Sequence, residues 1–257
     1  MNKTSSIATG AIESATTVEA PPATATRQVI PYNYLLSIGL VGLAVLCLNW
    51  DSTLSHPDNV KSVPGDLRKF IGLSEIFAHG FGVLVISLVL WLLVPNAARF
   101  IPRIAMCAFW PSLIVNGLKL QFYRWRPIRF FDEFSVSHFP ADQSETWLGW
   151  FAYDKWNMVY ATQSFPSAHT ATAWGLAIGM SWAFPKGRWL FFGIALLASV
   201  QRVISFAHWP SDVLVGAAIA FCFAGALTQN WGVGKWLSRL ESHWDHSKPS
   251  GDQTLQN

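Results

Sequence analysis

Three short groups of polar residues interrupt an otherwise apolar chain, and their residue types suit the binding of an anion. The groups are Lys119 with Arg126-Pro127, then Pro166-Ser167-Ala168-His169, then Arg202 with His208 and Asp212. Cations that cluster repel one another and lose hydration, so their grouping predicts that an anion sits among them. Phosphate is the natural occupant of such a cluster.

The spacing within the third group predicts a nucleophile. His208 and Asp212 are four residues apart, so they are expected to share one face of a helix, where the carboxylate can hold the imidazole in one tautomer. A neutral His208 can then attack phosphorus, with Asp212 stabilising the imidazolium character that develops. His169 is the candidate general acid for the leaving oxygen and, later, the general base for water.

The cations are expected to bind the non-bridging phosphate oxygens. Lys119, Arg126 and Arg202 supply the positive charge, and Ser167 adds a hydroxyl group. The second group stands where an apolar stretch begins, so free backbone N–H groups and the helix dipole would also favour the anion. Because these side chains meet the electrostatic demands of phosphoryl transfer, we expect neither a metal ion nor a cofactor.

The spacings Lys119-x6-Arg126-Pro127, Pro166-Ser167-x-His169 and Arg202-x5-His208-x3-Asp212 together resemble the three-part signature of the type 2 phosphatidic acid phosphatase superfamily. The resemblance covers roughly residues 30–232. It implies a helical membrane phosphatase whose substrate is phosphatidic acid, phosphatidylglycerol phosphate, undecaprenyl diphosphate or a lipid A phosphate. Two positions depart from the usual pattern, with Ala168 where glycine is common and Gln201 where serine is common.

The composition is that of a membrane protein. Only 13% of the residues are charged and 51% are hydrophobic, and 14 of them are Trp, a residue that gathers at membrane interfaces. The formal net charge of +3 is too small to indicate a nucleic acid partner. Cys47, Cys107 and Cys222 all lie in apolar runs, which predicts small core residues and not disulfides or zinc ligands.

Six apolar stretches approach the length of about 20 residues that crosses a bilayer. They are Tyr34–Trp50, Ile76–Val94, Ile101–Leu120, Ala168–Phe184, Trp189–Ser205 and Val213–Trp231. The predicted fold is therefore all-α, an integral membrane bundle of about six transmembrane helices. We expect residues 1–29 to be a disordered tail, residues 30–232 to be the membrane-embedded phosphatase domain and residues 233–257 to be a cytoplasmic tail.

The loops predict an orientation. Positive charge without acids marks three connections, which contain Arg99 and Arg103, Lys186 and Arg188, and Lys235 and Arg239. The positive-inside rule assigns these loops and both termini to the cytoplasm. The three polar groups then meet on the opposite, non-cytoplasmic face, which is the periplasmic face of a bacterial inner membrane, or a lumen in a eukaryote.

Two features have alternative interpretations. Glu75 and His79 either form an ion pair that pins the second apolar stretch in the bundle or contact the substrate. The aromatic insert at residues 128–165 is either an interfacial belt or a lid beside the site. In the external loop at residues 51–74, a short amphipathic helix is expected to start at Asp66.

These observations predict an integral membrane phosphatase that hydrolyses a lipid phosphate or diphosphate monoester through a phosphohistidine. The alternative is a phosphotransferase that passes the phosphoryl group to a lipid or sugar acceptor, which the same residues would serve. A transporter or scaffold with a degenerate site is disfavoured, because His169, His208 and Asp212 are all present. The expected partners are the lipid phosphate and membrane lipids; the particular lipid and the oligomeric state stay open.

Overall fold

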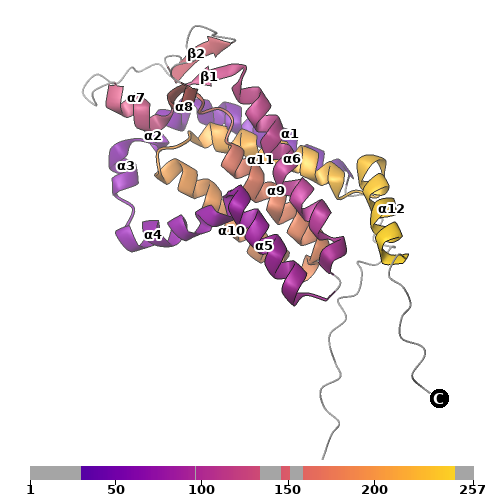
Figure 1. The fold of residues 1–257 in the computed structure, drawn as a ribbon. Helices are drawn as coiled ribbons and strands as arrows, with labels where there is room; N and C mark the ends of the chain where they lie inside the picture. Colours follow the sequence, from indigo (N-terminus) through magenta and orange to yellow (C-terminus); the bar gives the residue numbers. More distant parts are fainter. Residues whose placement is uncertain (1–29, 96, 134–145, 151–158, 247–257) are drawn as a thin grey trace, which may run out of the picture.

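The computed structural model describes residues 30–95, 97–133, 146–150 and 159–246. Long helices run side by side, and short helices and a two-stranded sheet gather at one end (Figure 1). In chain order the elements are α1 (Ile30–Cys47), η1 (Leu48–Trp50), α2 (Asp51–Leu54), α3 (Pro57–Lys61), α4 (Gly65–Leu73), η2 (Ser74–Ala78), α5 (Gly80–Leu93), η3 (Ala97–Arg99), α6 (Ile101–Lys119), β1 (Phe122–Arg124), α7 (Pro127–Glu133), β2 (Trp147–Trp150), α8 (Val159–Thr162), α9 (Ala168–Ala183), η7 (Pro185–Gly187), α10 (Arg188–Ile204), α11 (Pro210–Leu227) and α12 (Gly232–His246).

A helix stands at each of the six predicted apolar stretches, but six membrane spans are not confirmed. Within the described residues, four segments are long and apolar enough to cross a bilayer: Tyr32–Leu54, Ala97–Lys119, Pro185–Ile204 and Pro210–Leu227. A fifth exists only if the two segments Gly65–Ala78 and Gly80–Leu93, which meet at 74°, count as one broken span. Helix α9, with 16 residues, is shorter than a bilayer requires.

Helix α9 forms the centre of the bundle, packed against α6, α10 and α11. Its middle turns are buried almost without interruption. Gly175 permits the close approach of α6, because a Cβ atom there would stand 2.0 Å from the carbonyl oxygen of Cys107. Gly216 of α11 similarly faces the carbonyl of Ser167 at the start of α9. The first contact joins the middle of α9 to α6, and the second holds α11 against the start of α9, where one of the polar groups lies.

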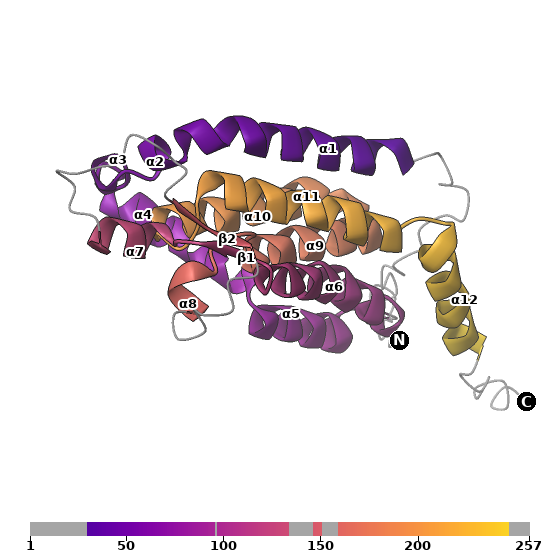
Figure 2. The same cartoon turned by 90° about the horizontal axis from the view of Figure 1, so that it is seen from above.

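The outer helices present apolar side chains to their surroundings. Seen from above, α1 lies along α11 on one side of the bundle, and α5 lies beside α6 on the other (Figure 2). Ser37 of α1 donates a hydrogen bond to the carbonyl of Ala218 in α11 at 2.8 Å. Large apolar side chains on the outside, including Ile38, Phe81 and Trp189, are more than two-thirds exposed. This surface, with the four apolar segments, is that of an integral membrane protein.

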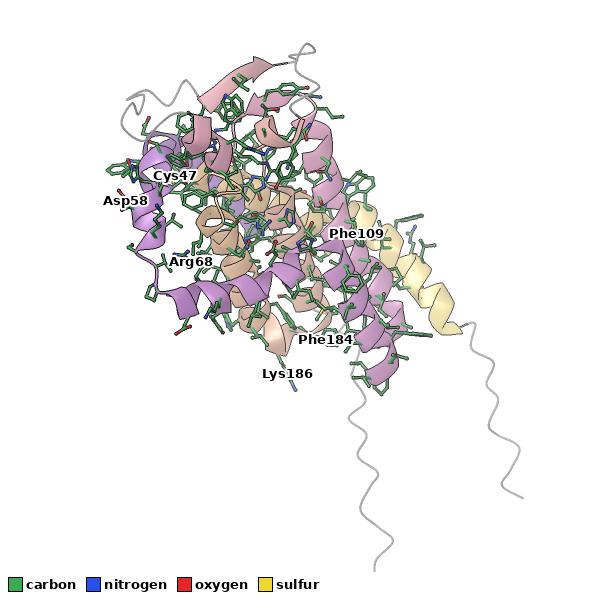
Figure 3. All side chains as sticks on the ribbon, turned by 60° about the vertical axis from the view of Figure 1, so that its left-hand side comes forward. Cys47, Asp58, Arg68, Phe109, Phe184 and Lys186 are labelled. Carbon is green, nitrogen blue, oxygen red and sulfur yellow. The ribbon has the colours of Figure 1, made fainter. Side chains whose placement is uncertain are left out.

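The two ends of the bundle differ. One end carries β1 paired antiparallel with β2, together with α2, α7 and α8 (Figure 1). The described chain begins and ends at the other end, where α1 starts and α12 stops (Figure 2). Figure 3 shows Cys47, at the close of α1, toward the first end, and Phe184 and Lys186 toward the second. The predicted membrane orientation stays a prediction.

Residues 233–246, assigned to a tail from the sequence, form most of α12, which is fastened to α6 by a buried ion pair. Arg103 is fully buried, and its Nε and Nη2 atoms both lie 2.8 Å from the carboxylate of Glu241. The guanidinium also donates to Ser238 and stacks on Trp182. Arg103 therefore has a structural role. Because its charge is buried in an ion pair and is not a loop charge, it adds little to the membrane orientation predicted from the positive-inside rule.

We predict that Glu241→Ala destabilises the fold. The change leaves the Arg103 guanidinium buried without its carboxylate, and breaking a buried pair in this way costs about 3–5 kcal/mol. The midpoint of thermal unfolding in detergent, followed by circular dichroism, should fall. Ser242→Ala is the control, because Ser242 lies on the exposed side of α12. An unchanged midpoint for Glu241→Ala would show that the pair contributes nothing to stability.

Candidate functional site

The structure brings the three polar groups to one end of the bundle. Lys119 is the last residue of α6, Ser167 caps the start of α9, and Arg202 lies in the last turn of α10. His169, in the first turn of α9, is within electrostatic reach of Arg202, His208 and Lys119. The predicted meeting of the three helix ends at one place is thus seen in the fold.

His208 does not lie on a helix, contrary to the expectation from its spacing to Asp212. Helix α11 begins only at Pro210, because proline suits the first helical position and its fixed φ pre-organises the turn. His208 Nδ1 lies 2.6 Å from the carbonyl oxygen of Ser164 but 3.8 Å from Oδ2 of Asp212. A carbonyl oxygen only accepts, so Nδ1 carries the proton and Nε2 keeps its lone pair. The tautomer is the expected one, but Ser164 holds it.

Burial keeps the His208 ring neutral. The side chain is 1% exposed, and this loss of hydration lowers the pKa of His208 from the ordinary 6.5 to about 4. Asp212 opposes the shift without cancelling it. At neutral pH the imidazole is therefore uncharged, with Nε2 available to attack an electrophile.

Asp212 organises the backbone and side chains around His208. Its Oδ2 accepts hydrogen bonds from the Ser164 hydroxyl at 2.5 Å and from the Trp209 N–H at 3.0 Å, which caps α11. The same Ser164 supplies the carbonyl that binds His208. Asp212 therefore acts on the imidazole through Ser164 and through its own charge 3.8 Å away.

Arg124 and Asp51 belong to this arrangement, although the sequence analysis singled out neither. Arg124 Nη1 donates to Asp212 Oδ1 at 2.6 Å, and Nη2 donates to Asp51 Oδ2 at 2.7 Å. All three side chains are completely buried. Ser211 adds a second link between Asp51 and Arg124, because it accepts from Arg124 and donates its hydroxyl and backbone N–H to Asp51. The signals were slight: an acid directly after an apolar stretch, and an arginine two residues before Arg126.

The predicted phosphate-binding cations differ in how many of their N–H donors are already bonded to other groups of the protein. Arg126 donates from Nε to the Tyr160 carbonyl at 2.8 Å, from Nη1 to Ala207 at 3.1 Å and from Nη2 to Gln163 at 3.3 Å. A guanidinium has five N–H donors, so two of them stay available to an anion. Lys119 is 8% exposed, lies within electrostatic reach of Arg126 and Asp212, and has no ion-pair partner among the described residues.

Arg202, the third cation, is paired with Glu75, and this relation was not anticipated. Nη2 of Arg202 donates to Oε1 of Glu75, and the same carboxylate oxygen lies 3.3 Å from Nε2 of His79. The His79 ring meets the His169 ring edge to face, with centroids 4.7 Å apart. The expected Glu75–His79 contact is therefore present. Both residues also lie at the site, beside Arg202 and His169.

Glu75, His79 and His169 are the residues that come nearest to a metal site in the described part of the chain. One ligand atom from each lies within 4.8 Å of the other two. However, Glu75 already binds the Arg202 guanidinium, and Lys119 adds a further positive charge near His169. A divalent cation here would meet repulsion from both, so the electrostatics of the site suit an anion better.

Ser167 is occupied as a helix cap. Its hydroxyl oxygen accepts from the backbone N–H of Thr170 at 3.4 Å and from the Thr170 hydroxyl at 3.0 Å. Its own N–H donates to the Asp212 carbonyl at 3.1 Å. The Ser167 hydroxyl hydrogen is the group left to reach an anion.

The aromatic insert at residues 128–165 lies partly outside the described residues, which include 128–133, 146–150 and 159–165 of it. The Arg124 guanidinium stacks on the Trp147 ring at 4.7 Å, and Trp147 also packs against Phe165. Trp147 therefore supports the buried ion network, a role that neither the belt nor the lid interpretation included.

We predict that the Asp51–Arg124–Asp212 network is energetically coupled. Arg124→Met leaves two buried carboxylates without their cation and should cost about 3–5 kcal/mol. Adding Asp51→Asn removes one unpaired charge, so the double variant should unfold at a higher temperature than Arg124→Met alone. Adding Asp66→Asn should give no such rescue, because Asp66 is fully exposed. Failure of Asp51→Asn to rescue would show that the carboxylates are not coupled through Arg124.

Comparison with known proteins identifies the family of the chain. The model of the PAP2 superfamily matches residues 103–233, about half of the chain. Lipid A 1-phosphatases of Rhizobium etli and Rhizobium johnstonii are each 30% identical over 113 residues, which is 44% of this chain and 42% or 40% of theirs. That of Porphyromonas gingivalis is 33% identical over 84 residues, 31% of this chain and 17% of its own. The chain thus spans less than half the length of these curated relatives, and no solved structure matches. Residues 103–233 hold all three polar groups, and the chain belongs to the PAP2 superfamily.

Proposed function

We propose that this protein is an integral membrane phosphatase that hydrolyses a lipid phosphate or diphosphate monoester through a phosphohistidine intermediate. The observation that carries the proposal is the state of His208, a buried neutral imidazole whose Nδ1–H is held by the Ser164 carbonyl. Its Nε2 lone pair is thereby free, among cations that suit a phosphate. Membership of the PAP2 superfamily and the names of the relatives agree with it.

In the first step, His208 Nε2 attacks phosphorus as the bond to the leaving oxygen breaks. Burial and the neighbouring cations lower the pKa of His169 to about 3, so the ring is neutral before substrate binds. The anionic phosphate offsets those cations, so that His169 takes up a proton in the complex and gives it to the leaving oxygen, and the alcohol leaves neutral. The phosphorylated imidazole keeps its Nδ1–H and becomes cationic. The Ser164 carbonyl and the Asp212 carboxylate, at 2.6 Å and 3.8 Å from Nδ1, stabilise that charge.

In the second step, water attacks the phosphohistidine. His169, now neutral, takes a proton from the water, the N–P bond breaks, and inorganic phosphate leaves with His208 restored to its neutral form. Lys119, Arg202 and the two available N–H groups of Arg126 balance the charge on the equatorial oxygens in both steps. These fixed cations take the electrostatic part that a metal ion takes in other phosphatases, so the mechanism needs none.

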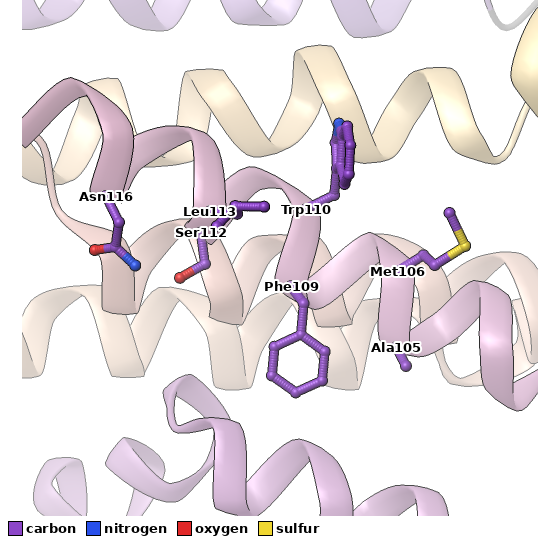
Figure 4. A pocket seen from close by; sticks show the side chains of 7 residues that line it. All are labelled: Ala105, Met106, Phe109, Trp110, Ser112, Leu113 and Asn116. Carbon is purple, nitrogen blue, oxygen red and sulfur yellow. The ribbon is translucent and has the colours of Figure 1, made fainter.

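A groove on α6 supports a lipid substrate. Its cavity of about 380 Å³ is lined by Ala105, Met106, Phe109, Trp110, Ser112, Leu113 and Asn116 (Figure 4). The polar pair, Ser112 and Asn116, lies at the end of the groove toward Lys119. Residues at such three- and four-residue intervals share one helix face. The Phe109 ring lies against Gly80, next to His79. We assign this groove to an acyl chain whose phosphate reaches Lys119.

The relatives named lipid A 1-phosphatase make lipid A 1-phosphate the first substrate to test. We further propose a bacterial inner membrane as the location, with the site facing the periplasm and both termini in the cytoplasm. The position of the described chain ends, opposite to the site, is consistent with that arrangement. Phosphatidic acid and undecaprenyl diphosphate complete the substrate panel.

We predict that His208→Gln abolishes both phosphate release and a labelled phosphoenzyme. Glutamine is close to histidine in size but cannot attack phosphorus, so the fold is kept and the chemistry lost. The assay follows phosphate release from the lipid panel in excess chelator, and the wild-type label should be acid-labile and alkali-stable, as for phosphohistidine. His56→Gln, at the cap of α3, is the control.

Full turnover by His208→Gln would sink the nucleophile assignment. Loss of wild-type turnover in chelator, restored by Mg²⁺, would overturn the metal-free mechanism. Transfer of the phosphoryl group to an added alcohol or sugar acceptor, without release of inorganic phosphate, would identify a phosphotransferase instead.

We predict that Ala105→Trp separates lipid from water-soluble substrates. The added ring fills the groove, so kcat/KM for a long-chain lipid phosphate should fall about tenfold, which is roughly 1.4 kcal/mol of lost binding. The same constant for a soluble aryl phosphate should hardly change. Leu46→Trp, at an exposed apolar position of α1, is the control. Equal losses on both substrates would mean that the groove shapes the site and holds no acyl chain.

A further inference from the structure

The carboxylate of Glu75 binds the arginine that the mechanism assigns to phosphate. Arg202 Nη2 donates to Glu75 Oε1. Gln201 Nε2 donates to Glu75 Oε2 at 3.0 Å, and Gln201 Oε1 accepts from Arg202 Nε. The three side chains thus close a ring. Gln201, one of the two departures from the usual pattern, is the residue that bridges the other two.

The ring joins two separate segments, since Glu75 belongs to η2 and the other two residues close α10. Glu75 and Asp212 differ in burial, because the Glu75 side chain is 35% exposed while that of Asp212 is fully buried. A charge that leaves a buried pair needs water or another partner. Glu75 has access to water when it moves, and Asp212 does not.

We propose that Glu75 is a displaceable internal anion, which holds Arg202 while the site is empty and yields it to the phosphoryl group of the substrate. Carboxylate and phosphate both bind a guanidinium through pairs of anionic oxygens, so they compete for the same donors. Two anions that share one cation repel each other. This inference rests on the proposed function, because it requires that Arg202 bind phosphate.

The displaced carboxylate stays close to the bound phosphate. The groups that face Glu75 are Arg202 and Gln201 from α10, and His79 at the start of α5, whose ring contacts His169 of α9. Gln201 and His79 can keep Glu75 in the site after it releases Arg202. Its charge then weakens phosphate binding and speeds the release of inorganic phosphate. Glu75 and Gln201 are therefore positioning residues that set affinity for the anion.

The test is the affinity for inorganic phosphate and for orthovanadate, measured by isothermal titration calorimetry on the full chain in detergent. Glu75→Gln keeps the size of the side chain and removes its charge, so both anions should bind about tenfold more tightly than to wild type. In turnover assays, the inhibition constant for phosphate and KM should fall together. Asp66→Asn makes the same change of charge at an exposed position of α4 and should leave both affinities unchanged.

Each other result counts against the proposal. Equal or weaker anion binding by Glu75→Gln would mean that Glu75 holds Arg202 in place for phosphate. Equal tightening by Asp66→Asn would reduce the effect to net charge. If wild type binds phosphate and only the proposal about Glu75 fails, the proposed function stands. If neither wild type nor Glu75→Gln binds phosphate or vanadate, the phosphate site fails, and this inference fails with it.

Discussion

The arrangement of the site depends on one buried cation, Arg124, held between Asp51 and Asp212. The two completely buried carboxylates are tolerable only because the guanidinium lies between them, since its removal leaves two negative charges in a medium of low dielectric. The network fixes the start of α11 against the junction of α1 and α2. Asp212 in turn accepts a hydrogen bond from the Ser164 hydroxyl, and the Ser164 carbonyl accepts one from His208. The orientation of the imidazole therefore depends on an arginine that binds carboxylates and is not assigned to the phosphate.

Three arginines near the site show how burial and partners divide a single residue type into different roles. Arg124 donates to two carboxylates and two hydroxyl groups and stacks on Trp147, so its role is structural. Arg126 uses three N–H groups on backbone carbonyls and keeps two. Arg202 is held by an acid that retains access to water. The positive charge offered to an anion is thus smaller than a count of basic residues suggests, and this limits the self-repulsion of the empty site.

The sequence predicted the apolar helices, which are local features of the chain. It did not predict the ion pairs between residues that are far apart in the sequence. The lengths of the apolar stretches predicted where the six helices lie. The positions of the three polar groups at the ends of these stretches predicted that the groups meet at one end of the bundle. The number of spans was not predictable in the same way, because α9 is short and lies among other helices, where an apolar run signals burial by protein as well as by lipid. The four-residue spacing of His208 and Asp212 suggested a shared helix, but Pro210 starts the helix between them.

The missed residues have a common cause. Asp51 and Arg124 are 73 positions apart, and Glu75 and Arg202 are 127 apart, so neither pair has a spacing that can be recognised. Each residue alone resembles a charge at the end of an apolar segment, where a solvated position is the ordinary expectation. The Glu75–His79 pair was visible because both members are local, whereas their connection to Arg202 exists only in the folded chain.

The segment shared with the family begins at residue 103, and both Asp51 and Glu75 lie before it. The matched segment therefore contains the cations of the site without two of the acids that hold them. A chimera that exchanged this segment alone between relatives would bury Arg124 beside whatever residue its host carries at the end of the first helix. Where that host residue is not an acid, Arg124 would keep Asp212 but lose its second carboxylate. The residues that form this site thus extend beyond the segment that the family model matches. An exchange that keeps the ion network intact has to include the end of the first helix, with Asp51.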